Sequence, residues 1–199
     1  MPKRPARAAK SESEARAAIT GAAVEQLLAG SVSRMTLESV ASAAHCAKGL
    51  VHYHFKTKDN LVAAAAGVIW ERRAQEWCEV LGGPDPAAGI RAGWSLITRE
   101  GASGVCMASA ALGTEASDIV VRTVSASRRN FTTRLEGALE TLFGHLGLRS
   151  SVPINEVALL MGAVIDGLGL QLASGAAADA VEPAWHAFWV GVLSLTRAV

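Results

Sequence analysis

The chain has 199 residues, carries 19 lysines and arginines against 18 aspartates and glutamates, and draws half of its residues from the hydrophobic set. This length allows one or two domains with a sizeable core, and a charged content of 19% argues against an intrinsically disordered protein. Every apolar run is interrupted before the roughly 18 uncharged residues that span a bilayer, and the basic N-terminus lacks the apolar stretch of a secretory signal. We therefore expect a cytoplasmic protein without a membrane partner.

The net charge of +1 hides an uneven distribution. Residues 1–60 hold nine basic and five acidic residues, whereas residues 61–199 hold ten basic and thirteen acidic ones, and no lysine follows Lys58. Such asymmetry suggests two functional parts, of which the first faces an anion. A solvated basic tail would give the same pattern, so the charge alone does not separate it from a nucleic-acid interface.

Helical periodicity runs through the whole chain, and no segment favours a strand. The first expected helix starts at Ser11, which has capping-box spacing to Glu14, and ends at Gly30. Thr36 can cap a short second helix. The remaining helices are expected over residues 47–53, 57–81, around 90–97, within 101–113, and over 117–146, 153–172 and 179–196. The sequence thus predicts an all-α fold of about nine helices.

The last two expected helices carry apolar residues over well over half of their circumference, more than packing on one neighbour requires. We expect them to form a four-helix bundle with a second copy of the chain. The residues assigned to this homodimer interface are Leu160, Val164, Leu168, Trp185, Trp189 and Val192. The alternative is that both helices are central in a monomeric core.

Sequence motifs of enzymes are absent: the chain has no zinc-protease helix, nucleophile elbow, phosphate loop or dinucleotide fingerprint. His52 and His54 would point in divergent directions on a helix, with no carboxylate one turn away, which disfavours a metal site. Cys106 has no charged neighbour in the sequence to make it reactive, so we interpret it as a buried apolar side chain rather than a redox thiol. We expect no enzyme activity, no metal and no cofactor.

Residues 36–61 stand out, with the sequence TLESVASAAHCAKGLVHYHFKTKDNL. A short capped helix, a tight connection and a second short helix dense in Lys, His and Tyr are typical of a helix-turn-helix, which lays its second helix in the major groove of DNA. The segment resembles the N-terminal DNA-binding domain of the TetR/AcrR family of bacterial transcriptional regulators. The residues that carry the resemblance are Gly30, Thr36, Leu37, Val40, Ala41, Ala44, Lys48, Gly49, Tyr53, His54, Phe55, Lys58 and Leu61, and more weakly the Asp166-Gly167 step.

Several positions depart from the family pattern. The turn usually reads Ala-Gly-Val-Ser, whereas this chain has Ala44-His45-Cys46-Ala47. The family glycine suits a left-handed backbone, which His tolerates better than most residues, at some cost. Ala47 can neither cap the next helix nor bond a phosphate, as the family serine could. His52 replaces a usual Tyr.

The candidate DNA-binding residues are Thr36, Lys48, Gly49, Leu50, His52, Tyr53, His54, Lys56 and Lys58, with a flexible basic arm of Lys3, Arg4 and Arg7. Within this set, Lys48, His52 and Tyr53 suit base edges, and Leu50 suits a thymine methyl group. The remaining basic side chains and the Thr36 hydroxyl suit phosphates, and the arm suits backbone or minor-groove contacts.

The resemblance implies three parts: the arm at 1–10, a DNA-binding domain at 11–60 with its helix-turn-helix at 36–55, and a regulatory domain at 61–199 for ligand binding and dimerisation. It also implies a ligand cavity, for which Trp70, Trp77, Trp94, Met107 and Phe131 are candidates, although aromatic residues at helical spacing are more typical of a core. Because few charges interrupt residues 86–112, we expect an apolar or amphipathic small-molecule effector.

The expected function is that of a ligand-responsive, dimeric transcriptional repressor that leaves a near-palindromic operator in double-stranded DNA when the ligand binds. Two alternatives remain open from the sequence. One is a helical small-molecule-binding or enzymatic protein whose basic N-terminus is incidental, and the other is a transcriptional activator of the same fold.

Overall fold

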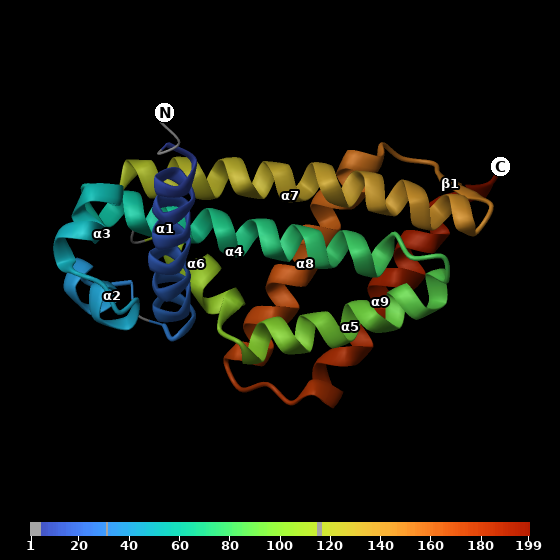
Figure 1. Cartoon of the computed structure of the whole chain (residues 1–199). Coiled ribbons are helices and arrows are strands. Elements are labelled where there is room, and N and C mark those ends of the chain that lie inside the picture. Colours follow the sequence, from blue (N-terminus) through green and yellow to red (C-terminus); the bar gives the residue numbers. More distant parts are fainter. Residues whose placement is uncertain (1–4, 31, 115–116) are drawn as a thin grey trace. The chain divides into compact units, whose positions relative to one another are not determined.

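The computed structural model describes residues 5–30, 32–114 and 117–199, which form nine α-helices and two short strands (Figure 1). The helices are α1 (Pro5–Leu28), α2 (Leu37–Ala43), α3 (Lys48–Phe55), α4 (Lys58–Leu81), α5 (Pro86–Ala102), α6 (Val105–Thr114), α7 (Asp118–His145), α8 (Ile154–Ala173) and α9 (Ala178–Ser194). The all-α prediction is confirmed.

Two strands were not predicted. β1 (Leu148–Ser150) and β2 (Thr196–Ala198) pair antiparallel, with Arg149 opposite Arg197. The expectation that no segment forms a strand is therefore wrong at these two places. Three residues are too few to show the alternation of apolar and polar side chains by which a strand is recognised.

The first helix is longer than the sequence indicated. α1 begins at Pro5, so Ser11 lies inside the helix and does not cap it. Residues 5–10, including Arg7, therefore belong to the helix, whereas Lys3 and Arg4 of the expected arm lie outside the described residues. The end of the helix is as predicted, because Gly30 follows it with a φ of 81°, a conformation that glycine adopts without steric cost.

The chain gathers into two compact units. The N-terminal unit comprises the described residues within 1–69 and 108–124, and the C-terminal unit comprises residues 70–107 and 125–199. α4 contributes its first half to the N-terminal unit and its second half to the C-terminal unit.

The N-terminal unit is built on an apolar face shared by its first three helices. α1 packs against α2 and α3, and α2 packs against α3. The side chains that fill the space between them are fully or almost fully buried; they are Ile19, Ala23, Val24, Leu27, Val40, Ala41, Val51 and Phe55. Burial of about eight such side chains is the main force that fixes the short helices, which are too short to be stable alone.

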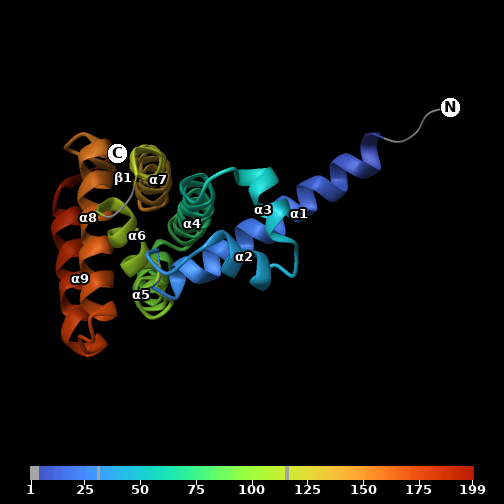
Figure 2. The ribbon, with the colours of Figure 1, turned by 90° about the vertical axis from the view of Figure 1, so that its left-hand side faces the viewer.

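The C-terminal unit places α8 against both α5 and α9, and α8 and α9 run side by side (Figure 2). Trp185 of α9 reaches α5, where its indole N–H donates to the Ile90 carbonyl at 3.0 Å. Gly93 makes room for this ring, because a Cβ there would lie 2.7 Å from the Trp185 Cζ2 atom. By length and composition alone α8 is long and apolar enough to cross a membrane. A core helix can meet the same two criteria, and Val157 and Ile165 of α8 are buried.

The predicted dimer residues divide between core and surface. Trp185, Trp189, Val192 and Leu168 are buried inside the C-terminal unit itself, at 1–6% exposure, so these side chains offer little surface to a second copy, and their place in an interface stays a prediction. Leu160 and Val164 stay accessible on α8. Periodicity identified the buried stripe of α9, whereas on α8 the predicted positions Leu160 and Val164 lie one residue away from the buried Met161 and Ile165.

Candidate nucleic-acid interface and ligand pocket

Thr36 starts α2 through a reciprocal pair of hydrogen bonds. Its Oγ1 accepts from the Ser39 N–H at 3.0 Å, and the Ser39 Oγ accepts from the Thr36 N–H at 3.0 Å. The Ser39 hydroxyl also donates to Gln26 Oε1 of α1 at 2.9 Å. The predicted cap at Thr36 is confirmed, and the same cluster ties the start of the helix-turn-helix to the helix that supports it.

The turn between α2 and α3 depends on a left-handed residue. His45 has a φ of 51°, and the following Cys46 N–H donates to the Ala41 carbonyl at 3.0 Å, which closes the end of α2. The prediction that His takes the left-handed conformation of the family glycine is confirmed. Ala47 starts α3 without a side-chain hydrogen bond, so the expected loss of a cap is also confirmed.

α3 has one buried and one exposed face. Val51 and Phe55 seat the helix in the core, and the Arg16 guanidinium lies 4.9 Å from the centre of the Phe55 ring. The opposite face presents Lys48 and Tyr53 to solvent, with Tyr53 58% exposed. An exposed tyrosine on a helix whose other face is buried in the core is typical of a binding surface.

The other candidate DNA-contacting residues are placed less uniformly. Gly49, His52 and Lys56 are exposed, Leu50 and Lys58 are half-buried, and Lys58 donates to the Ser33 carbonyl at 3.3 Å. His54 is half-buried, and its Nε2 atom is buried without a hydrogen-bond partner. The phosphate contact expected of His54 is therefore not available to that nitrogen.

Two acidic residues that the sequence reasoning missed contact the exposed face of α3. Glu38 Oε2 lies 3.3 Å from Lys48 Nζ, and Glu12 Oε1 accepts from the Tyr53 hydroxyl at 3.2 Å. All four side chains are exposed. Contacts of this kind are worth little in water, so DNA phosphates and base edges can replace them at small cost. The i, i+3 and i, i+4 rules could not reveal them, because both pairs join different helices.

The five residues proposed to line a ligand cavity are not all together. Trp70 and Phe131 do line one pocket of about 180 Å³. Trp77 is fully buried and packs on Trp185, and Met107 is 48% exposed. Trp94 is half-buried on α5. Helical spacing gives the face of a residue but not what covers it, so a place for these last three residues in a ligand cavity stays a prediction.

The pocket has an aromatic wall and a charged edge. Besides Trp70 and Phe131, its lining residues are Arg128, Thr132, Leu159, Gly162, Ala163 and Asp166. The Trp70 and Phe131 rings meet edge to face, with centres 5.8 Å apart. Arg128 reaches over the Trp70 ring at 5.4 Å, and its Nη2 lies 3.8 Å from Asp166 Oδ2.

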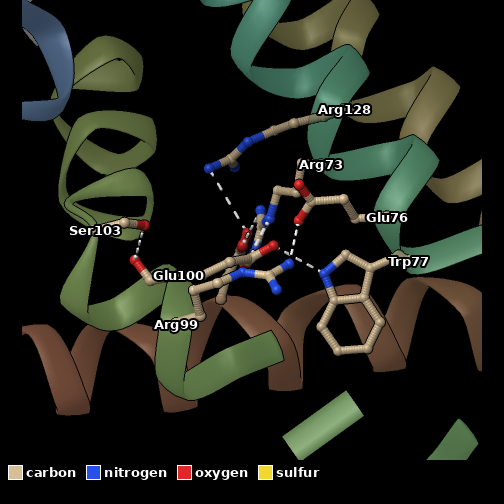
Figure 3. Close-up of polar contacts among 8 residues, drawn as sticks. Arg73, Glu76, Trp77, Arg99, Glu100, Ser103 and Arg128 are labelled. Atoms are coloured by element: carbon tan, nitrogen blue, oxygen red, sulfur yellow. Dashed lines mark hydrogen bonds and ion pairs between the residues drawn. The ribbon is translucent and has the colours of Figure 1, made fainter. Parts of the chain in front are cut away.

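Behind this edge lies a buried ion cluster (Figure 3). Arg73 of α4, whose side chain is 1% exposed, donates to Glu100 Oε2 of α5 at 2.9 Å and to Asp166 Oδ1 of α8 at 2.6 Å. The other Glu100 oxygen accepts from the Trp77 indole N–H at 2.9 Å. Burial by itself lowers the pKa of Arg73, but the charges and hydrogen bonds of Glu100 and Asp166 outweigh burial and raise it.

Cys106 packs against α8 as an apolar side chain. It is 3% exposed, and a Cβ on Gly169 would collide with its Sγ atom. Desolvation by burial raises the pKa of its thiol to about 12. The interpretation of Cys106 as a buried apolar side chain is confirmed by its burial.

Comparison with known proteins places the helix-turn-helix in a family. Residues 19–65 match the family model described as "Bacterial regulatory proteins, tetR family". The match covers α2, α3 and the exposed face described above. Curated proteins give no match to the chain.

Solved structures resemble the whole chain. A TetR transcriptional regulator from Chloroflexus aurantiacus J-10-FL has a TM-score of 0.75 at 16% identity, covering 96% of this chain and 100% of that one. A TetR transcription regulator from Haloarcula marismortui has a TM-score of 0.73 at 16% identity, covering 93% and 100%. NalD, the secondary repressor of the MexAB-OprM multidrug efflux pump in Pseudomonas aeruginosa, has a TM-score of 0.59 at 22% identity, covering 92% and 98%. At these identities the likeness shows the fold.

Proposed function

We propose that the chain is a dimeric transcriptional repressor of the tetR type that a small ligand releases from a near-palindromic operator, because residues 19–65 match the model of the tetR family of bacterial regulatory proteins. The observation that carries the proposal is α3, which is seated by Val51 and Phe55 and presents Lys48, His52 and Tyr53 to solvent. This is the arrangement by which a recognition helix reads the major groove.

The roles within the interface follow from what each side chain can offer. Lys48 can donate to guanine acceptors, and the exposed ring and hydroxyl of Tyr53 can contact a thymine methyl group and a base or phosphate oxygen. Lys56 and Lys58 supply positive charge for phosphates. Thr36 uses its hydroxyl oxygen as an acceptor within the α2 cap, which leaves its O–H free to donate to a phosphate.

The test begins with a selection of binding sequences from random duplexes, using the full chain. Lys48→Ala and Tyr53→Ala should each weaken the selected site by about 1–3 kcal/mol, and Lys48→Ala should also reduce the slope of log affinity against log salt by about one. Arg91→Ala, an exposed cation on α5, is the matched control and should leave binding unchanged. Unchanged binding of both recognition-helix variants would refute the interface.

For the homodimer we propose the outer face of α8 and α9. Leu160 is 49% exposed and Val190 is 71% exposed, and small residues such as Gly167, Ala187 and Gly191 beside them would permit close helix approach. Apolar side chains gathered on one face of a helix pair favour a partner of the same kind. Operators read by two such chains would be near-palindromic.

Sedimentation tests this face. Leu160→Glu and Val190→Glu should each give monomers at micromolar concentration, because the charge would be buried in the dimer. Met107→Glu is the control, since Met107 is 48% exposed but lies outside α8 and α9. A wild-type monomer, or dimers in both variants, would contradict the assignment.

Repression is separated from activation by the position of the operator relative to a promoter, so the transcription of a reporter under the selected site decides between them. We favour this function over the alternative of a helical enzyme with an incidental basic segment, because Lys48, Lys56 and Lys58 lie within the residues that match the family model. We place the protein in the cytoplasm, where a bacterial operator is found.

A further inference from the structure

The pocket between α4, α7 and α8 holds the strongest unassigned chemistry of the C-terminal unit. Its wall is apolar, with the Trp70 and Phe131 rings opposite Leu159, Gly162 and Ala163. At about 180 Å³ it is smaller than the roughly 300–1,000 Å³ typical of drug-sized ligands. The occupant that fits such a space is one ring with a short substituent.

The charges at the edge of the pocket are not equally available. Asp166 Oδ1 is already engaged at 2.6 Å by the buried Arg73. Arg128, by contrast, meets Asp166 Oδ2 only at 3.8 Å, which is too long for a hydrogen bond, and its side chain is 49% exposed. Figure 3 shows the Arg128 side chain extending from α7 toward this cluster. Its guanidinium therefore keeps donors in the planar arrangement that matches a carboxylate.

The aromatic wall lies beside the charged edge. Trp70 lines the pocket, and the Arg128 guanidinium lies 5.4 Å from the centre of the Trp70 ring. A ligand ring packed on Trp70 would therefore bring a short acidic substituent close to Arg128. A cationic ligand would also have to approach two guanidinium groups, those of Arg128 and of Arg73 behind Asp166.

We propose that this pocket binds a small aromatic carboxylate, whose ring packs on Trp70 and Phe131 and whose carboxylate pairs with the Arg128 guanidinium. The regulatory part of this inference rests on the proposed function, since binding would draw Arg128 away from Asp166, the residue that holds Arg73 of α4. The ligand class itself rests on the pocket alone.

The test uses two probes with the same ring and opposite charge, phenylacetate and 2-phenylethylamine, titrated calorimetrically into the full chain. Phenylacetate should bind and the amine should not. Arg128→Gln should weaken the acid at least tenfold, because it removes a charge-assisted, two-pronged contact. Arg129→Gln removes the same charge from the next, exposed residue of α7, which does not line the pocket, and should change the affinity less than twofold.

Three results would overturn the inference: no binding of the acid, tighter binding of the amine, or an affinity for the acid that Arg128→Gln leaves unchanged. Circular dichroism of Arg128→Gln checks that the variant is folded, and the wild-type comparison of acid and amine does not depend on it.

Operator binding measured in the same samples separates this inference from the proposed function. Phenylacetate that binds through Arg128 without releasing DNA would support the pocket and refute its regulatory part. Specific DNA binding by a chain that takes up neither probe would leave the DNA-binding proposal intact and refute the pocket.

Discussion

The recognition helix and the centre of the C-terminal unit use the same kinds of charged groups in opposite settings. Lys48 and Glu38 meet at 3.3 Å with both side chains more than 60% exposed. Arg73 meets Glu100 and Asp166 at 2.9 and 2.6 Å, with only 1% of its side chain exposed. Water surrounds both members of the first pair but is kept away from Arg73 and Glu100 in the second, whose side chains are 1% and 5% exposed.

The difference shows what each pair is suited for. An exposed pair contributes about 0–1 kcal/mol to stability, so its lysine can exchange a carboxylate for a phosphate or a base edge. A buried cluster is costly to form and still more costly to break, so it fixes the helices that contribute to it. Here Arg73, Glu100 and Asp166 join α4, α5 and α8.

The largest expected effect comes from breaking the buried cluster. Arg73→Ala should lower the free energy of unfolding by about 3–5 kcal/mol, because it leaves Glu100 buried and uncompensated. Urea denaturation measures this effect. Arg99→Ala is the matched control one residue before Glu100, since Arg99 pairs with Glu76 on the surface at 2.6 Å, and it should cost about 0–1 kcal/mol. Equal losses in the two variants would remove the distinction between buried and exposed pairs.

Close packing near the cluster gives the next effect. Gly169→Ala should cost about 1–3 kcal/mol, because the added methyl group would collide with the Cys106 Sγ atom. Cys106→Ala removes that atom, so the double variant should recover part of the loss. A double-mutant cycle of thermal or urea unfolding measures the coupling. Additive losses would show that α6 and α8 relax independently at this contact.

In the N-terminal unit the turn residue offers a test of backbone strain. His45→Gly should stabilise the helix-turn-helix by about 1 kcal/mol, since a φ of 51° strains every residue but glycine. Gly30→Ala should do the reverse, because Gly30 has a φ of 81° and open space around its Cβ position. Hydrogen exchange of the Val40 and Val51 amides reports both changes. An unchanged exchange rate in His45→Gly would show that the turn is not strained.

The smallest effect concerns the start of the recognition helix. Ala47→Ser should stabilise α3 by about 1 kcal/mol, because the residue has a φ of −70° and a ψ of 140°, which suit a cap, and it now has no side-chain bond to the helix. The same hydroxyl could reach a phosphate, so operator affinity should rise as well. Ala47→Val lacks the hydroxyl and should do neither. Helicity by circular dichroism and a binding titration separate the two gains.

The predictions from the sequence were most accurate for helix caps and turns, which depend on a few neighbouring residues. Thr36 as a cap, His45 in the left-handed region and Ala47 without a cap all follow from the chemistry of one residue and its neighbours. Periodicity likewise identified the stripe that holds Trp185 and Trp189. It could not say that α5 covers Trp185, because that contact depends on Gly93, 92 residues earlier in the chain, leaving space for the ring.

Two members of the buried ion cluster, Arg73 and Glu100, could have been recognised in the sequence. Arg73 lies three and four residues from Trp70 and Trp77 on α4, and Glu100 lies three residues after Ile97 on α5, so both charges interrupt apolar stripes. A charge in such a position must find a partner when the helix packs. The pairing itself could not be predicted, since Asp166 is 93 residues from Arg73 and only the fold brings them together.

The pairing of β1 with β2 has a consequence for how the C-terminal unit opens. The two strands hold residues 148 and 198 together and so close a loop that contains all of α8 and α9. While the two strands stay paired, the chain between them remains a closed loop. The helices in that loop therefore gain less conformational entropy when they separate than helices with a free end would. The amides of α8 and α9 should therefore exchange with solvent as one cooperative unit, slower than those of a helix pair with a free end.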